Sequence, residues 1–205
     1  VVGVVAPWNY PFQLAVIPLV NAIAAGNRVM VKPSEFTPQV SALLEKMLSA
    51  VFSSDEVAVV QGGAELGAAF TQLPFDHLIF TGSTAVGKHV MAAAAANLTP
   101  VTLELGDKSP ALVAPDYPIE QAAERIAFGK CFNAGQTCVA PDYVLLPEAQ
   151  LEPFIAAFMA SVKRRYPDLT HDDDYTGIIN ERQYTRLQAW LAEAQAAGVR
   201  TIAYD

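Results

Sequence analysis

Cys138 is the residue whose type and surroundings most directly suggest chemistry. It lies in the segment 132–141, FNAGQTCVAP, which contains a glycine and mostly small side chains. A thiol attacks as its thiolate, and the N–H groups of a polar turn can stabilise that anion, whereas a cysteine in an apolar strand is inert. A single cysteine is, however, more often a small core residue. Cys131, which follows the apolar run Ile126-Ala127-Phe128, fits that second description.

Glu104 interrupts the apolar run Val101–Leu103 shortly before Gly106. A carboxylate in a buried strand must be paired, protonated or functional, because burial without a partner is costly. A buried carboxylate also holds its proton more tightly, as a general base working near neutral pH must. Two interpretations therefore stay open for Glu104: a general base, or a structural ion pair with Lys108.

Three more polar residues directly follow predicted strands. Asn9, in PWNYP, could be a helix cap or a turn residue, or its amide could donate to the oxyanion of an acyl-transfer reaction. Lys32 and Glu35, in KPSE, could be solvated loop charges. Open parallel sheets nevertheless bind ligands beyond the carboxyl ends of their strands, which favours a binding role for both residues.

The segment 82–88, GSTAVGK, follows the strand-like run HLIFT and fits all but the last position of the P-loop pattern. His89 stands where a serine or threonine hydroxyl should bind Mg²⁺, so a P-loop NTPase is disfavoured. As a strand-to-helix turn, Gly82 and Ser83 could still place backbone N–H groups against a dinucleotide pyrophosphate.

Short β-branched runs alternate with alanine-rich stretches, which predicts βαβ units and a largely parallel sheet. Strands are predicted at 1–6, 28–32, 57–60, 77–81, 101–105, 111–114 and 143–146, and helices at 12–25, 38–50, 65–72, 84–96, 118–132, 149–165 and 181–197. Gly26 should end the first helix, and Thr37-Pro38 should begin the second. A change in composition near Leu103–Pro110 suggests a boundary between two subdomains.

Composition excludes several classes of function. With 52% hydrophobic residues the chain should pack a core, and a formal charge of −8 argues against a nucleic-acid partner. Two cysteines form neither a disulfide framework nor a metal motif, which favours a reduced, cytoplasmic setting without a metal. The longest apolar stretch, 14–25, is too short to span a membrane. The strand-like runs at both ends, VVGVVAPW and AAGVRTIAYD, suggest a piece of a longer protein.

Five segments, PWNYPF, KPSE, FTGSTAVGK, LELGDKSP and FNAGQTCVAPDY, occur in the order of the aldehyde dehydrogenase superfamily, and this resemblance covers nearly the whole chain. The sequence is most similar to the class 3 branch, which includes fatty, aromatic and bacterial coniferyl aldehyde dehydrogenases. The resemblance implies an α/β fold, with part of an NAD(P)-binding domain and its Rossmann-like parallel sheet over 1–103. Residues 104–205 would form the start of a second α/β domain, the catalytic domain.

The resemblance also implies roles for individual residues. Cys138 would attack an aldehyde, Glu104 would activate the hydrolytic water, and Asn9 with the Cys138 N–H would bind the oxyanion. Lys32 and Glu35 would lie near the adenosine ribose, and Gly82 and Ser83 near the pyrophosphate. The cofactor would be NAD, with NADP as the alternative, the substrate a small aldehyde, and the full-length protein a cytoplasmic homodimer.

The sequence departs from the family pattern at Asp107, where the family usually has the second glycine of ELGGKSP. Its carboxylate could repel that of Glu104 or point toward Lys108. The family's downstream glutamate-phenylalanine motif would lie beyond Asp205. Two alternatives stay open: a CoA-acylating relative, which the glutamate at 104 argues against, and a non-catalytic relative, which would be expected to lose Cys138 or Glu104.

Overall fold

Five short strands rich in valine and other apolar residues pair into one parallel sheet in the first half of the chain. They are β1 (Val2–Val5), β2 (Val29–Lys32), β3 (Val57–Val59), β4 (His77–Gly82) and β5 (Val101–Leu105), in the order β3-β2-β1-β4-β5. The computed structural model describes residues 1–169 and 175–204. This half, Val1–Gly106, is one of two compact units; the other is Asp107–Asp205.

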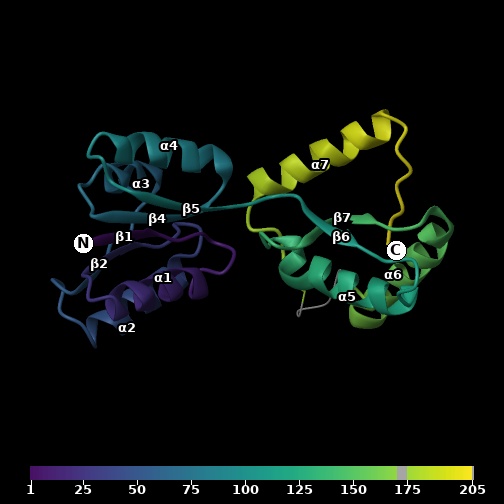
Figure 1. The fold of residues 1–205 in the computed structure, drawn as a ribbon, viewed down its shortest axis with the longest axis horizontal. Coiled ribbons are helices and arrows are strands. Elements are labelled where there is room, and N and C mark those ends of the chain that lie inside the picture. The colour runs from purple at the N-terminus through teal and green to yellow at the C-terminus, as the bar shows by residue number, and fades with distance from the viewer. Residues whose placement is uncertain (170–174, 205) are drawn as a thin grey trace. The chain divides into compact units, whose positions relative to one another are not determined.

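Helices cover both faces of the sheet. Helices α1 (Gln13–Ala24) and α2 (Pro38–Ser49) lie on one face, and α3 (Ala64–Thr71) and α4 (Thr84–Ala95) lie on the other (Figure 1). Side chains of β1 and β2 pack with α1 and α2 into one core, and side chains of β4 and β5 pack with α3 and α4 into a second. Fully burying a leucine or valine contributes roughly 1.5–3 kcal/mol, so these two cores hold the sheet edges in place.

The second unit is built around two parallel strands, β6 (Ser109–Leu112) and β7 (Pro141–Leu145). Helix α5 (Ile119–Cys131) packs on α6 (Leu151–Arg165) through buried alanines and Phe154, and α7 (Glu181–Ala196) completes the unit. Two 3₁₀ turns, Phe132–Gly135 and Glu148–Gln150, flank β7.

The predicted α/β fold is confirmed, and every predicted strand and helix overlaps an observed one, apart from the strand-like run at the end of the chain. Gly26 ends α1 with a φ of 79°, and Pro38 is the first residue of α2, as expected. Residues 199–204 are not a strand, because no strand of the described residues pairs with them. Among the described residues, no helix is both long and apolar enough to cross a membrane.

Candidate functional site

The parallel sheet brings six of the predicted site residues to the carboxyl ends of its strands. The chain runs from β1 to its neighbour β2 on one side, and β4 and β5 add to the other side of β1, so the strand order reverses between β1 and β4. Open α/β sheets bind ligands beyond the carboxyl ends of the strands at such a reversal. The residues at or just after these carboxyl ends are Asn9, Lys32, Glu35, Gly82, Ser83 and Glu104.

Lys32 and Glu35 form a partly buried ion pair at the end of β2. Lys32 is 4% exposed, and its Nζ donates to Oε2 of Glu35 at 2.7 Å. Burial alone would raise the pKa of Glu35, but the hydrogen bond from Lys32, a backbone hydrogen bond and the charge of Lys32 together outweigh burial, and the pKa is lowered. Glu35 is therefore an ionised carboxylate, with a side chain 33% exposed, that can accept hydrogen bonds from sugar hydroxyls.

The turn from β4 into α4 has the geometry of an anion-binding helix start. Ser83 caps α4, because its hydroxyl accepts from the N–H of Val86 at 3.3 Å. The first N–H groups of a helix, here those of Thr84 and Ala85, have no acceptor within the helix, and they favour a bound phosphate.

Gly82 is needed because the ring of Phe80 lies against it. A Cβ at Gly82 would lie 2.5 Å from Cζ of Phe80, whose side chain is buried. The same ring lies 3.6 Å from the Cβ position of Gly87 on α4. The two glycines let α4 approach the sheet closely, so its N-terminus lies directly beyond β4.

Glu104 is exposed rather than buried, which corrects the prediction from its apolar neighbours. Val101, Leu103 and Leu105 pack toward α3 and α4, so the alternating residue Glu104 points to the opposite face. The helices on that opposite face, α1 and α2, pack over β1 and β2. β5 is an edge strand, separated from β1 by β4. The glutamate is therefore hydrated at the carboxyl end of β5, beside Thr81 in the register.

Lys108 forms an ion pair within the second unit, where its Nζ lies 3.4 Å from a carboxylate oxygen of Asp142. Asp107 is also exposed, and its Oδ1 accepts from the Lys108 N–H at 2.7 Å. Lys108 is therefore held by Asp107 and by Asp142 of β7.

Asn9 lies in the loop between β1 and α1 and is half-buried. The residue at the N-cap position of α1 is Phe12, with no side-chain cap, so Asn9 does not cap that helix. Asn9 therefore lies beyond the carboxyl end of β1, in the segment that leads into α1.

Cys138 lies in the second unit, in an exposed turn between the 3₁₀ turn 132–135 and β7. The N–H of Ala140 donates to the carbonyl of Thr137 at 3.1 Å, which closes a turn around the cysteine. The preceding residues Asn133, Ala134 and Gly135 have φ angles of 52°, 53° and 72°. This left-handed run directs the chain abruptly from α5 into the cysteine turn.

Gln136 is a residue of this segment that sequence reasoning missed. Its side-chain Nε2 donates to the carbonyls of Asn133 and Gly177, each at 3.1 Å. Its Oε1 accepts from the N–H of Ile179 at 3.0 Å. Nothing in the spacing of FNAGQTC indicates these contacts, because two of them reach residues more than forty positions away.

The other cysteine, Cys131, is the last residue of α5 and is half-buried. Burial raises the pKa of its thiol, although the nearby charges of Lys130 and Arg165 partly oppose this. Its environment is therefore less favourable for a thiolate than exposed solvent.

The first unit has the features that a dinucleotide needs. It offers a helix N-terminus for the pyrophosphate, an ionised carboxylate for the ribose, and a glycine turn held close to the sheet by Phe80. The donors and acceptors present therefore fit an NAD(P) cofactor. No group of three metal-binding side chains occurs within residues 1–169 and 175–204.

Comparisons with known proteins agree on one family. The model of the aldehyde dehydrogenase family matches residues 1–204. A probable coniferyl aldehyde dehydrogenase of Pseudomonas aeruginosa is 57% identical over 98% of this chain and 42% of its own length. A dimeric, NADP-preferring aldehyde dehydrogenase of the mouse is 46% identical over 91% of this chain and 42% of its own length.

A solved structure gives the same picture. The Mycobacterium tuberculosis aldehyde dehydrogenase complexed with NAD⁺ is 34% identical, with a TM-score of 0.86 over 98% of this chain and 43% of the other. The chain thus spans less than half of the length of the relatives it matches.

Proposed function

Because this chain belongs to the aldehyde dehydrogenase family, we propose that the whole protein oxidises an aldehyde to a carboxylic acid with NAD(P)⁺. The observation that carries the proposal is the exposed thiol of Cys138, held in a polar turn that follows a left-handed run. A nucleophilic cysteine needs such access, and small neighbours leave room for a carbonyl group.

The cofactor would be held by residues of the first unit. Glu35 and Lys32 would bind the adenosine ribose, and Gly82, Ser83 and the first N–H groups of α4 would bind the pyrophosphate. When bound, the nicotinamide supplies the hydride acceptor. The ionised Glu35 favours NAD, because a carboxylate repels the 2′-phosphate of NADP, and NADP is the alternative.

In the first half of the reaction, the Cys138 thiolate adds to the aldehyde carbon and forms a carbon–sulfur bond. The carbonyl electron pair moves to oxygen, and the amide of Asn9 and the N–H of Cys138 stabilise this oxyanion. With NAD(P)⁺ held by the first unit, the hydride that leaves the aldehyde carbon as the oxyanion collapses would have a two-electron acceptor, and the acyl group on Cys138 would then be a thioester.

In the second half, Glu104 accepts a proton from water, which attacks the thioester carbon. The carbon–sulfur bond breaks, the acid leaves, and the Cys138 thiolate is regenerated. Exposure suits this role, because water must reach the carboxylate of Glu104. Transfer of the acyl group to coenzyme A would not need this base, so a free acid is the expected product.

The substrate class and the setting follow from the relatives. We propose an aliphatic or aromatic aldehyde, such as coniferyl aldehyde, because the Pseudomonas relative carries that name. The mouse relative is called dimeric, which supports a homodimer of the full-length protein. Two free cysteines and no disulfide among the described residues agree with a cytoplasmic location.

Replacing the two cysteines separately in the full-length protein tests the proposal. Cys138→Ala should abolish aldehyde-dependent formation of NAD(P)H, because no neighbouring group can form the thioester. The matched control Cys131→Ala should keep most of the activity, because its thiol is half-buried at the end of α5. Equal losses in two folded variants, or acyl-CoA as the only product, would contradict the proposal.

A further inference from the structure

We infer that Gln136 positions the nucleophile, by clamping the turn that carries Cys138 to the segment before α7. This inference rests on the proposed function of Cys138. Because the Cys138 side chain is exposed, packing does not fix it, and the position of its sulfur depends on the backbone on either side.

On the C-terminal side, the backbone is fixed at the start of β7. Pro141 pairs with Ser109 in the sheet register, and its Cγ and Cδ lie 3.4 and 3.2 Å from the Cβ position of Gly129 on α5. The side chain of Asp142, the next residue, lies 3.5 Å from Nζ of Lys130. Residues after the cysteine are therefore anchored to both the strand pair and the helix.

On the N-terminal side, the backbone is strained. Ala134 has a φ of 53°, a conformation that residues other than glycine and asparagine rarely adopt. Such a run persists only when surrounding contacts hold it in place. Two hydrogen bonds within the turn help to hold it, from the Gln136 N–H to the Asn133 carbonyl and from Asn133 Nδ2 to the Gln136 carbonyl. The Gln136 amide adds the link to the rest of the unit, because its Nε2 donates both back to Asn133 and across to Gly177.

The anchor on the other side of this clamp is itself well fixed. Gly177 and Ile179 lie three residues and one residue before Asn180, whose side chain caps α7 by accepting from the N–H of Gln183 at 3.0 Å. Both ends of the amide are used, since Oε1 accepts from Ile179 while Nε2 donates to two carbonyls. The clamp thus joins the cysteine turn to the start of α7.

Gln136→Met in the full-length protein removes the amide and keeps the length of the side chain. We expect faster hydrogen exchange of the backbone amides at 136–139. The pre-steady-state burst of NAD(P)H should slow by roughly 10- to 100-fold, because small displacements of reacting atoms cost large factors in rate. KM for the aldehyde should change little, since both ends of the Gln136 amide are engaged by the backbone of Asn133, Gly177 and Ile179.

Gln150→Met is the matched control. Gln150 also makes a long-range hydrogen bond within the second unit, from Nε2 to the carbonyl of Pro115 at 3.1 Å. It follows β7 in the sequence, whereas the cysteine turn precedes β7. This variant should lose some stability and keep the burst and the exchange at 136–139. Equal changes in both methionine variants would reduce Gln136 to a general contribution to stability and overturn the inference.

Gln136→Glu adds a second measurement, the pH dependence of the burst rate, which should not change if Gln136 only contributed to stability. The carboxylate keeps an acceptor for Ile179 but faces two carbonyl oxygens, whereas its protonated form regains one donor. The burst rate of this variant, relative to that of the unmodified protein, should therefore rise as the pH falls. Unchanged exchange in Gln136→Met overturns the inference whatever the activity, whereas absence of turnover in the unmodified protein overturns the proposed function alone.

Discussion

At the residue scale, the two cysteines differ in what their surroundings allow. Cys138 is exposed in a turn, whereas Cys131 is half-buried at the end of α5 and burial raises the pKa of its thiol. A raised pKa means a smaller thiolate fraction at any given pH near neutrality, and the thiolate is the form that reacts. The difference in chemistry that the sequence suggested thus has a physical cause in burial.

Alkylation measures this difference directly. At pH 7.5, iodoacetamide should modify Cys138 of the folded full-length protein at least several-fold faster than Cys131. The preference should shrink as the pH rises toward the raised pKa of Cys131, and it should disappear in denaturant, where burial is lost. Peptide mass spectrometry over time gives both rates, and faster labelling of Cys131 in the folded protein would contradict this account.

Glu104 shows why the sequence could not specify its environment. Its apolar neighbours Leu103 and Leu105 indicated a buried strand, but β5 is at the sheet edge and alternate residues face opposite sides. Burial of the α1 face depends on which helices reach β5, and that depends on the whole topology. The sequence thus indicated a functional role for Glu104 from its residue type, but its exposure could not be predicted.

At the element scale, most of the architecture could be predicted, because its signals are local. Short β-branched runs marked the strands, Gly26 marked the end of α1, and Pro38 marked the start of α2, where the structure has them. The left-handed run at 133–135 could not be predicted, because a positive φ at Ala134 contradicts the local preference of alanine. The hydrogen bonds of Gln136 could not be predicted either, because two of its partners are distant in the sequence.

The approach of α4 to the sheet gives a prediction at this scale. Gly82→Ser places a Cβ against the buried ring of Phe80, which must shift, so it should lower the free energy of unfolding by roughly 1–3 kcal/mol. It should also weaken NAD(P) binding, because the start of α4 moves. Urea denaturation and cofactor titration of the full-length protein measure the two effects.

Gly63→Ser is the matched control for this change. Gly63 has open space around its Cβ position and an extended backbone, and it occupies the N-cap of α3, where serine is favourable. This variant should be as stable as the unmodified protein or slightly more so. A Gly82→Ser variant as stable as Gly63→Ser would show that the close packing of Phe80 is unimportant.

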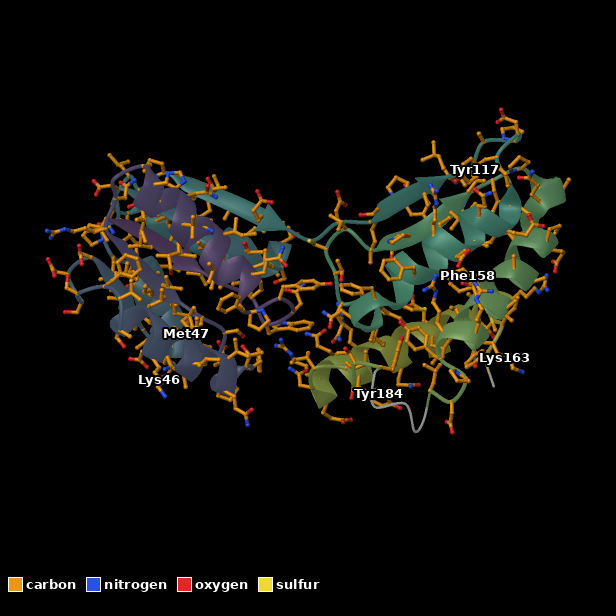
Figure 2. All side chains as sticks on the ribbon, turned by 90° about the horizontal axis from the view of Figure 1, so that it is seen from below. Lys46, Met47, Tyr117, Phe158, Lys163 and Tyr184 are labelled. Atoms are coloured by element: carbon orange, nitrogen blue, oxygen red, sulfur yellow. The ribbon has the colours of Figure 1, made fainter. Side chains whose placement is uncertain are left out.

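At the scale of the whole molecule, the second unit exposes large apolar side chains. Trp190 and Leu191 on α7 are 49% and 46% exposed, and Leu112 and Leu145 on the two strands are 75% and 53% exposed. Figure 2 shows Tyr184, also on α7, at the surface. This chain covers 42% of the length of the Pseudomonas relative.

Residues 1–205 prepared alone should therefore bind a hydrophobic dye and form little NAD(P)H from aldehyde. Exposed apolar surface of this extent favours association, and hydride transfer needs positioning that a partial set of contacts does not supply. Dye fluorescence, light scattering and a turnover assay check this together. Robust turnover by this chain as a monomer would show that the site is complete within it.

An acyl intermediate trapped in Glu104→Gln would show directly that Cys138 and Glu104 act in successive steps. The glutamine keeps the shape of the side chain but cannot accept a proton from water, so the thioester should form and hydrolyse slowly. Full-length Glu104→Gln protein would be mixed with aldehyde and NAD⁺, digested, and analysed by mass spectrometry. The account predicts a burst of NADH and an acyl group on the peptide that contains Cys138. Steady turnover without that adduct, or an acyl group on Cys131 instead, would contradict it.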